Sequence, residues 1–274
     1  METQAFAEKG LRSALSTHTR PPRSSPLSAS LIFWWRAMLK IKHIPEQMFD
    51  VTASPIMFLL MFTYLFGGAL AGSTGEYLQF VLPGILVMTV AFITIYTGLG
   101  INSDIKKGIF DRFRSLPIWQ PAFLVGALLG DTVRYTIASV VVVVLGLIMG
   151  FRPDGGAVGV LLSVLLLLVF SFSLSWVWIA LGLVMRTPES LMAVSMIILF
   201  PLTFVSNVFV SPETMPVWLE ALVDVNPITY LVTAIRGLMF DTTVAKEIGW
   251  VLLTCALLVT VFSPLTMYLY RKKR

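Results

Sequence analysis

Apolar runs of nearly 20 residues recur through most of this chain, and they limit its fold more than any other feature. A helix needs about 20 apolar residues to cross roughly 30 Å of hydrocarbon. Only 13% of the 274 residues are charged, against about 25% in ordinary soluble domains. Residues 160–170, with Ser163 the one hydroxyl, are apolar on every side, whereas the strands of a membrane barrel alternate in character. The sequence therefore predicts an all-α integral membrane protein.

Six transmembrane helices are expected in one transmembrane domain, residues 28–270. Residues 228–240 are apolar but too short to cross, so we expect short re-entrant helices in an external segment, residues 211–248. The amino-terminal residues 1–27 lack the apolar stretch of a signal peptide and are read as a flexible cytoplasmic tail. The predicted spans are residues 51–71, 78–101, 121–149, 157–184, 190–210 and 249–269.

Charge supports an even number of spans, because cytoplasmic flanks of membrane helices collect Lys and Arg. With six spans and the amino terminus inside, all of the 20 Lys and Arg residues except Arg152, Arg236 and Lys246 lie on the cytoplasmic side. A seventh span would move the basic end, residues 271–274, to the outside. Both termini are therefore expected in the cytoplasm.

Residues 28–44 resemble a helix that lies in the lipid headgroup layer. Two tryptophans, Trp34 and Trp35, fall beside basic residues, and Pro45 follows. The predicted apolar face is Leu31, Trp34, Trp35, Met38 and Ile41, and the predicted polar face is Arg36, Lys40 and His43. A packed soluble helix is the alternative.

Several kinds of site are disfavoured by the sequence. Cys255 is the only cysteine, which excludes an intramolecular disulfide or a cysteine metal cluster, and His18 and His43 lie far from grouped carboxylates. No segment matches the glycine-rich loop that ends in Gly-Lys-Ser or Gly-Lys-Thr, so this chain is not expected to bind a nucleotide. No metal, cofactor or nucleic acid is expected on it.

The loop between the second and third spans, residues 102–120, carries the most informative pattern. It reads NSDIKKGIFDRFRSLPIWQ, with apolar residues at offsets of four, eight and eleven from Ile105 and charged residues on another face. This pattern predicts a short cytoplasmic amphipathic helix that contacts a partner. A basic connector that is amphipathic by chance is the alternative.

This loop is where the chain resembles a known family, the type-two ABC exporter permeases. Gly108, Asp111, Arg112, Leu116 and Pro117 follow the series found in that family's coupling helix. FVSNVFVSPETMPVW, VDVNPITYLV and IRGLMF resemble its hydrophobic external segment. Longer strings, TYLFGGALAGSTGEYLQF and FDRFRSLPIW among them, resemble the family's daunorubicin and doxorubicin resistance permeases.

The resemblance implies a transport subunit and not an enzyme. Two such permeases would pair with two copies of a separate ATPase subunit, which binds ATP and Mg, in a bacterial inner membrane. They would move a hydrophobic or amphipathic compound outward, in this case an anthracycline-like antibiotic. The residues expected to couple to the ATPase are Lys107, Gly108, Asp111, Arg112, Arg114, Leu116 and Pro117.

Adaptable Met and aromatic side chains on the first and fifth spans are candidates for the substrate path between two permeases. They are Met57, Phe58, Met61, Phe62, Met192, Met196, Phe200 and Phe204. In the third span, Asp131 and Arg134 are spaced to pair on one helix face, either as a structural pair or as a gate.

Three alternatives to an anthracycline exporter stay open at this point. A proton-coupled drug antiporter needs a titratable residue deep in a span, and only Asp131 fits that position. A membrane-embedded enzyme needs a nucleophile with a base, but Ser171, Ser173 and Ser175 have no nearby His or Asp in the sequence. A lipid or polyketide exporter of the same family is the third.

The charge pattern generates a test of topology. Reporter domains fused after Arg274 and within the tail, residues 1–27, should both report the cytoplasm, because the basic flanks hold both ends inside. A reporter fused within the external segment, residues 211–248, is the control and should report the outside of the cell. An external signal after Arg274 would contradict the six-span arrangement.

Overall fold

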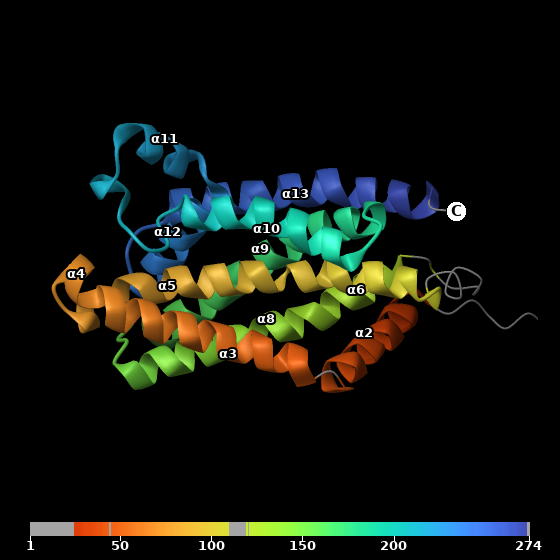
Figure 1. The fold of residues 1–274 in the computed structure, drawn as a ribbon, viewed down its shortest axis with the longest axis horizontal. Helices are drawn as coiled ribbons and strands as arrows, with labels where there is room; N and C mark the ends of the chain where they lie inside the picture. Colours follow the sequence, from red (N-terminus) through yellow and green to blue (C-terminus); the bar gives the residue numbers. More distant parts are fainter. Residues whose placement is uncertain (1–24, 44, 110–118, 120, 273–274) are drawn as a thin grey trace, which may run out of the picture.

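The structure, a computed structural model, describes residues 25–43, 45–109, 119 and 121–272. Helices make up most of this described chain, and the long ones lie side by side along one axis (Figure 1). In chain order the elements are α2 (Pro26–His43), α3 (Pro45–Met61), the π-helix η1 (Phe62–Phe66), α4 (Gly67–Ala71), α5 (Thr74–Ile93), α6 (Ile95–Lys106), α8 (Ala122–Met149), α9 (Gly156–Val184), α10 (Pro188–Phe204), the 3₁₀ turn η2 (Pro212–Thr214), α11 (Val217–Val225), α12 (Pro227–Met239) and α13 (Ala245–Lys272).

Five helical segments are long and apolar enough to cross a membrane, which confirms the predicted all-α membrane fold. They are α3 with η1 and α4, α5 with α6, and the single helices α8, α9 and α13. The remaining predicted span is the shorter α10, whose 17 residues extend about 25 Å at 1.5 Å per residue. Its length lies at the lower limit for a crossing helix.

The predicted fifth span, residues 190–210, is wrong at its carboxyl end, because α10 stops at Phe204. Asn226 Nδ2 donates to the carbonyl oxygens of Leu202 (2.7 Å) and Val205 at this helix end. These carbonyl groups therefore do not need the N–H groups of a further helical turn. Residues 205–210 continue as non-helical backbone, which is tolerated at membrane depth where protein surrounds it.

The second span is longer than predicted, because helix continues from Asn102 to Lys106 instead of ending at residue 101. Asn102 Nδ2 donates to the carbonyl oxygens of Gly182 and Met185 at the end of α9, each at 2.8 Å. A polar residue that looks like part of a loop is thus a buried link between two helix ends. The first residues of the predicted loop, 102–106, belong to the bundle.

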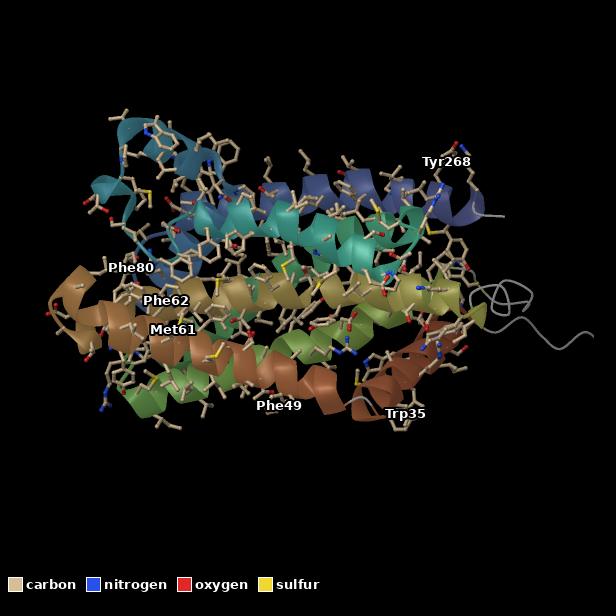
Figure 2. The ribbon with its side chains drawn as sticks, viewed as in Figure 1. Trp35, Phe49, Met61, Phe62, Phe80 and Tyr268 are labelled. Carbon is tan, nitrogen blue, oxygen red and sulfur yellow. The ribbon has the colours of Figure 1, made fainter. Side chains whose placement is uncertain are left out.

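Helix α2 forms where a headgroup-layer helix was predicted, but the predicted faces are wrong in part. The side that packs on the bundle carries Phe33 and Ala37, because Gly126 and Gly130 on α8 leave room for them. A Cβ at either glycine would overlap the Cβ of Phe33 or Ala37. Trp35, 60% exposed, points away from the bundle (Figure 2). Arg36, predicted on the outer polar face, instead turns inward to Asp104.

The two described chain ends lie at the same end of the bundle, as six crossings require (Figure 1). Helix α2, the end of α6 and the end of α13 gather there, and α4 and α11 mark the opposite end. The predicted short helices of the external segment, residues 211–248, are present as α11 and α12. The arrangement therefore places the end of α6 and both described ends of the chain on one side.

The α5–α6 segment is the centre of the bundle. In its most apolar stretch 83% of the residues are buried, against 11% in α13, so α13 lies at the periphery of the bundle. Where α5 passes into α6, Thr94 Oγ1 accepts a hydrogen bond from Trp178 Nε1 on α9 (2.7 Å). One turn later, Thr97 shares a hydrogen bond with Tyr135 OH on α8 (2.8 Å), which shares another with Ser175 on α9 (2.8 Å). Hydroxyl groups thus connect three helices inside the bundle.

Close approach of α6 to α9 depends on two glycines, Gly98 and Gly182. A Cβ on Gly98 would overlap the carbonyl oxygen of Trp178, and a Cβ on Gly182 would lie 2.6 Å from the carbonyl oxygen of Gly98. Backbone atoms form this contact, so no side chain can rotate away.

Gly98→Ala should therefore lower the stability of the purified protein by about 1–3 kcal/mol through overpacking. Gly249→Ala is the matched control, because a Cβ there meets nothing within 4 Å and alanine favours helix. Thermal unfolding in detergent would show a lower midpoint for Gly98→Ala only. Equal midpoints for both variants would contradict the contact.

Candidate functional site

An apolar groove of about 460 Å³ lies between α3, α10 and the central α5–α6 segment. Such a groove is large enough for a drug-sized molecule, since small-molecule sites commonly span about 300–1,000 Å³. Five of the predicted path residues line it: Phe58, Met192, Met196, Phe200 and Phe204. The structure thus brings the first and fifth spans to one groove.

The other three predicted path residues do not line the groove. Met57 and Met61 are 60% and 37% exposed. Met57 lies one residue before the groove-lining Phe58, so the helix turns its side chain away from the groove. Phe62 stacks on Phe209 with ring centroids 4.3 Å apart. It is not among the residues that line the groove.

Sequence reasoning missed the back wall of the groove, which the central segment supplies. Its helix is apolar on all sides, so no periodicity distinguishes the side that faces the groove. The missed lining residues are Met88, Thr89, Phe92, Ile93, Ile95, Tyr96 and Leu99, with Val51, Ser54 and Pro55 on α3.

Aromatic rings form a continuous series from α3 to α10. Phe62 stacks on Phe58 (6.2 Å) and on Phe209 (4.3 Å). Phe209 contacts Phe204 (5.2 Å), which stacks on Phe200 (4.2 Å). Three of these rings, those of Phe58, Phe200 and Phe204, also line the groove. Stacked and tilted rings of this kind favour flat aromatic ligands over purely aliphatic ones.

A second cavity, of about 340 Å³, lies between α2, α6 and α8 and carries charged groups. Arg36 on α2 pairs with Asp104 on α6 (3.3 Å). Asp131 and Arg134 on α8 pair with one another at 2.8 Å, which is the geometry that their spacing indicates. Asp104 was missed as a buried group, because the sequence places it in the loop.

The predicted coupling residues fall mostly outside the described part of the chain. Lys107 lines the charged cavity, and Gly108 ends α6 with a φ of 66°, a backbone conformation that favours glycine. The residues outside the described ranges are Asp111, Arg112, Arg114, Leu116 and Pro117. Their role as an amphipathic coupling helix stays a prediction.

At the opposite end, Arg236 on α12 holds the external segment to the central helix. Its Nη2 donates to the carbonyl oxygens of Phe80 (3.0 Å) and Asn207 (3.2 Å), and its guanidinium lies 4.0 Å from the Phe80 ring centroid. Tyr77 OH donates to the Phe209 carbonyl oxygen (3.1 Å). These bonds tie α5 to α12 and to residues 205–210, beside Phe62 (Figure 2). The sequence feature that indicates this link is Arg236, a single arginine in an apolar segment.

Within the described ranges, no three His, Cys, Asp or Glu side chains gather as a metal site would require. Two cavities in the described part of the molecule, the apolar groove and the charged cavity, contain residues that the sequence singles out.

Comparisons with known proteins agree with the motif resemblance. Residues 29–240 match the family model described as ABC-2 type transporter. The daunorubicin resistance ABC transporter permease protein DrrB1 of Streptomyces coeruleorubidus is 55% identical over 96% of this chain and 93% of its own length. The doxorubicin resistance ABC transporter permease protein DrrB of Mycobacterium tuberculosis is 25% identical over 74% of both chains. The inner membrane transport permease YadH of Escherichia coli is 23% identical over 66% of this chain and 72% of its own.

Proposed function

The chain belongs to the ABC-2 type transporter family, and we propose that it exports a flat amphipathic compound of the anthracycline type. It is a permease subunit, the membrane-spanning part of an ABC transporter, and export driven by a separate ATPase is the role of its family. The substrate class is proposed from the groove of this chain and from the name of its relative DrrB1, a daunorubicin resistance permease. The single observation that carries it is the aromatic groove, which is lined by Phe58 on α3 and by Phe200 and Phe204 on α10.

The proposed complex contains two copies of this chain and two copies of an ATP-binding subunit. ATP and Mg are bound by that subunit, and no cofactor is needed on this chain. The exposed phenylalanine Phe200 (54%) and the outward side of α3 supply an apolar edge against which a second copy would close the groove. The complex would lie in a bacterial plasma membrane with both termini in the cytoplasm.

In this proposal, the loop after Lys107 transmits the movement of the ATPase. Helix α6 leads directly into that loop, and α8 leaves it, so a push on the loop acts on both helices that flank the charged cavity. The coupling residues are those that the family resemblance gives, Lys107 and Gly108 with the five that follow. The external helices α11 and α12 form the exit side.

Two buried carboxylates, Asp104 and Asp131, are the groups that a proton-coupled antiporter would use. Each pairs with an arginine, at 3.3 Å and 2.8 Å, and such pairing is the usual structural arrangement of charges inside a membrane bundle. ATP-driven export is therefore the better supported mechanism.

The coupling proposal predicts the effect of reversing two charges in the loop. In cells that also make the ATPase subunit, Asp111→Lys with Arg114→Glu should reduce daunorubicin efflux, because docking depends on a few contacts and each rim charge contributes about 1 kcal/mol. We expect roughly a tenfold loss of efflux, at about 1.4 kcal/mol for each factor of ten. Retained drug fluorescence is the measurement.

Lys246→Glu with Glu247→Lys, at the opposite end of the bundle, is the matched control and should leave efflux unchanged. Membrane insertion and co-purification of the ATPase are measured for both variants. Unchanged efflux and co-purification in the loop variant, with normal insertion, would mean that the loop is an ordinary connector.

A further inference from the structure

The charged cavity and the apolar groove share part of their walls. Tyr96 and Leu99 on α6 line both, so the two spaces are neighbours on opposite sides of one helix turn. An amphipathic molecule in the groove would therefore have its polar end within reach of the cavity. This inference rests on the proposed export of such a molecule.

The cavity combines carboxylates with aromatic rings. Asp104 and Asp131 are only 6% and 8% exposed, and Phe33, Phe123 and Tyr96 also line the space. A carboxylate beside aromatic faces is a favourable setting for an organic ammonium ion, which gains both an ion pair and cation–π contact. The same setting offers little to a neutral polar group.

The protein's own Arg36 shows where a cation is stable in this cavity. Its Nη2 lies 3.3 Å from Asp104 Oδ2, and its guanidinium carbon lies 5.9 Å from the centroid of the Phe123 ring. The contacts are those that a ligand ammonium group would make. Arg36 thus marks a cation position between α6 and α8.

The two ion pairs of the cavity differ in how readily another cation can displace the arginine. Arg134 and Asp131 lie on one helix at 2.8 Å, with side chains 7% and 11% exposed. Arg36 comes from the peripheral helix α2, and its side chain is 35% exposed. A long arginine side chain at that depth can extend to the headgroup layer without leaving its helix. The Arg36–Asp104 pair is therefore the exchangeable one.

We propose that Asp104 binds the amine of a cationic amphipathic substrate, and that Arg36 holds this position until the substrate replaces it. The flat apolar part of the same molecule lies in the aromatic groove beyond Tyr96 and Leu99. Replacement keeps one cation beside the buried carboxylate at every stage, so no uncompensated charge is left in the bundle. Arg36 is then an internal competitor that selects for cationic substrates.

An anionic lipid headgroup is the competing occupant, since Arg36, Lys107 and Arg134 also line the cavity. When Arg36 leaves the cavity, Lys107 and Arg134 remain opposite Asp104 and Asp131, and an ammonium ion restores the cation beside the buried Asp104, whereas an anion would leave that carboxylate uncompensated. The two occupants predict opposite effects of removing Arg36, which makes them separable by experiment.

The test uses the full-length chain in lipid nanodiscs, with daunorubicin as the cationic probe and its N-acetyl derivative as the neutral one. Asp104→Asn should weaken binding of the amine about tenfold, the effect of losing one charged hydrogen bond, and leave the neutral derivative unchanged. Arg36→Gln should strengthen binding of the amine by about threefold, because the competing cation, whose side chain is 35% exposed, is gone. Arg36→Lys keeps the charge and should bind like the unmodified chain. Fluorescence titration gives the affinities.

Misfolding would weaken binding, so the higher affinity expected of Arg36→Gln cannot come from a damaged protein. If Arg36→Gln and Asp104→Asn weaken both compounds equally, the pair is only structural and the inference is wrong. If Arg36→Gln weakens binding and anionic lipid competes with the probe, the cavity is a headgroup site. If the unmodified chain binds neither compound, the proposed substrate class and this inference both fail.

Discussion

The hydrocarbon around this bundle offers no hydrogen bonds, and that constraint governs how its helices meet. Polar side chains at the centre of the bundle therefore bond to one another: Trp178 donates to Thr94, and Tyr135 lies between Thr97 and Ser175. At the helix ends, Asn102 and Asn226 donate to carbonyl groups of neighbouring helices. The central α5–α6 segment is thus fixed to α8 and α9, and the other helices are placed around it.

A rigid centre leaves two spaces at its sides, and their chemistry differs because their neighbours differ. Toward α3 and α10 the central segment meets Met and Phe side chains, which form an apolar groove suited to flat rings. Toward α2 and α8 it meets arginines and carboxylates. Tyr96 and Leu99 line both spaces. One molecule with an apolar and a charged end can therefore be recognised by both.

Five of the six predicted spans are helices long and apolar enough to cross, because length and apolar character alone decide which segments can cross, and the sixth is the shorter α10. The sequence did not predict the helix ends and packing faces that depend on contacts between residues far apart in the chain. The end of α6 is set by carbonyl groups of α9 that Asn102 reaches, and the packing face of α2 is set by Gly126 and Gly130 on α8. A third of the residues that line the groove were among the Met and Phe side chains singled out on the first and fifth spans. The central wall was not, because a helix buried on all sides carries no periodic signal.

The central claim is that this permease moves a flat amphipathic drug and that ATP hydrolysis on a separate chain drives the movement. The most direct measurement is daunorubicin uptake into inside-out vesicles reconstituted with the purified chain, with and without its ATPase subunit. The account predicts ATP-dependent uptake only when both subunits are present, and no uptake from a pH gradient alone. Uptake driven by a pH gradient, or ATP hydrolysis by the isolated chain, would contradict it.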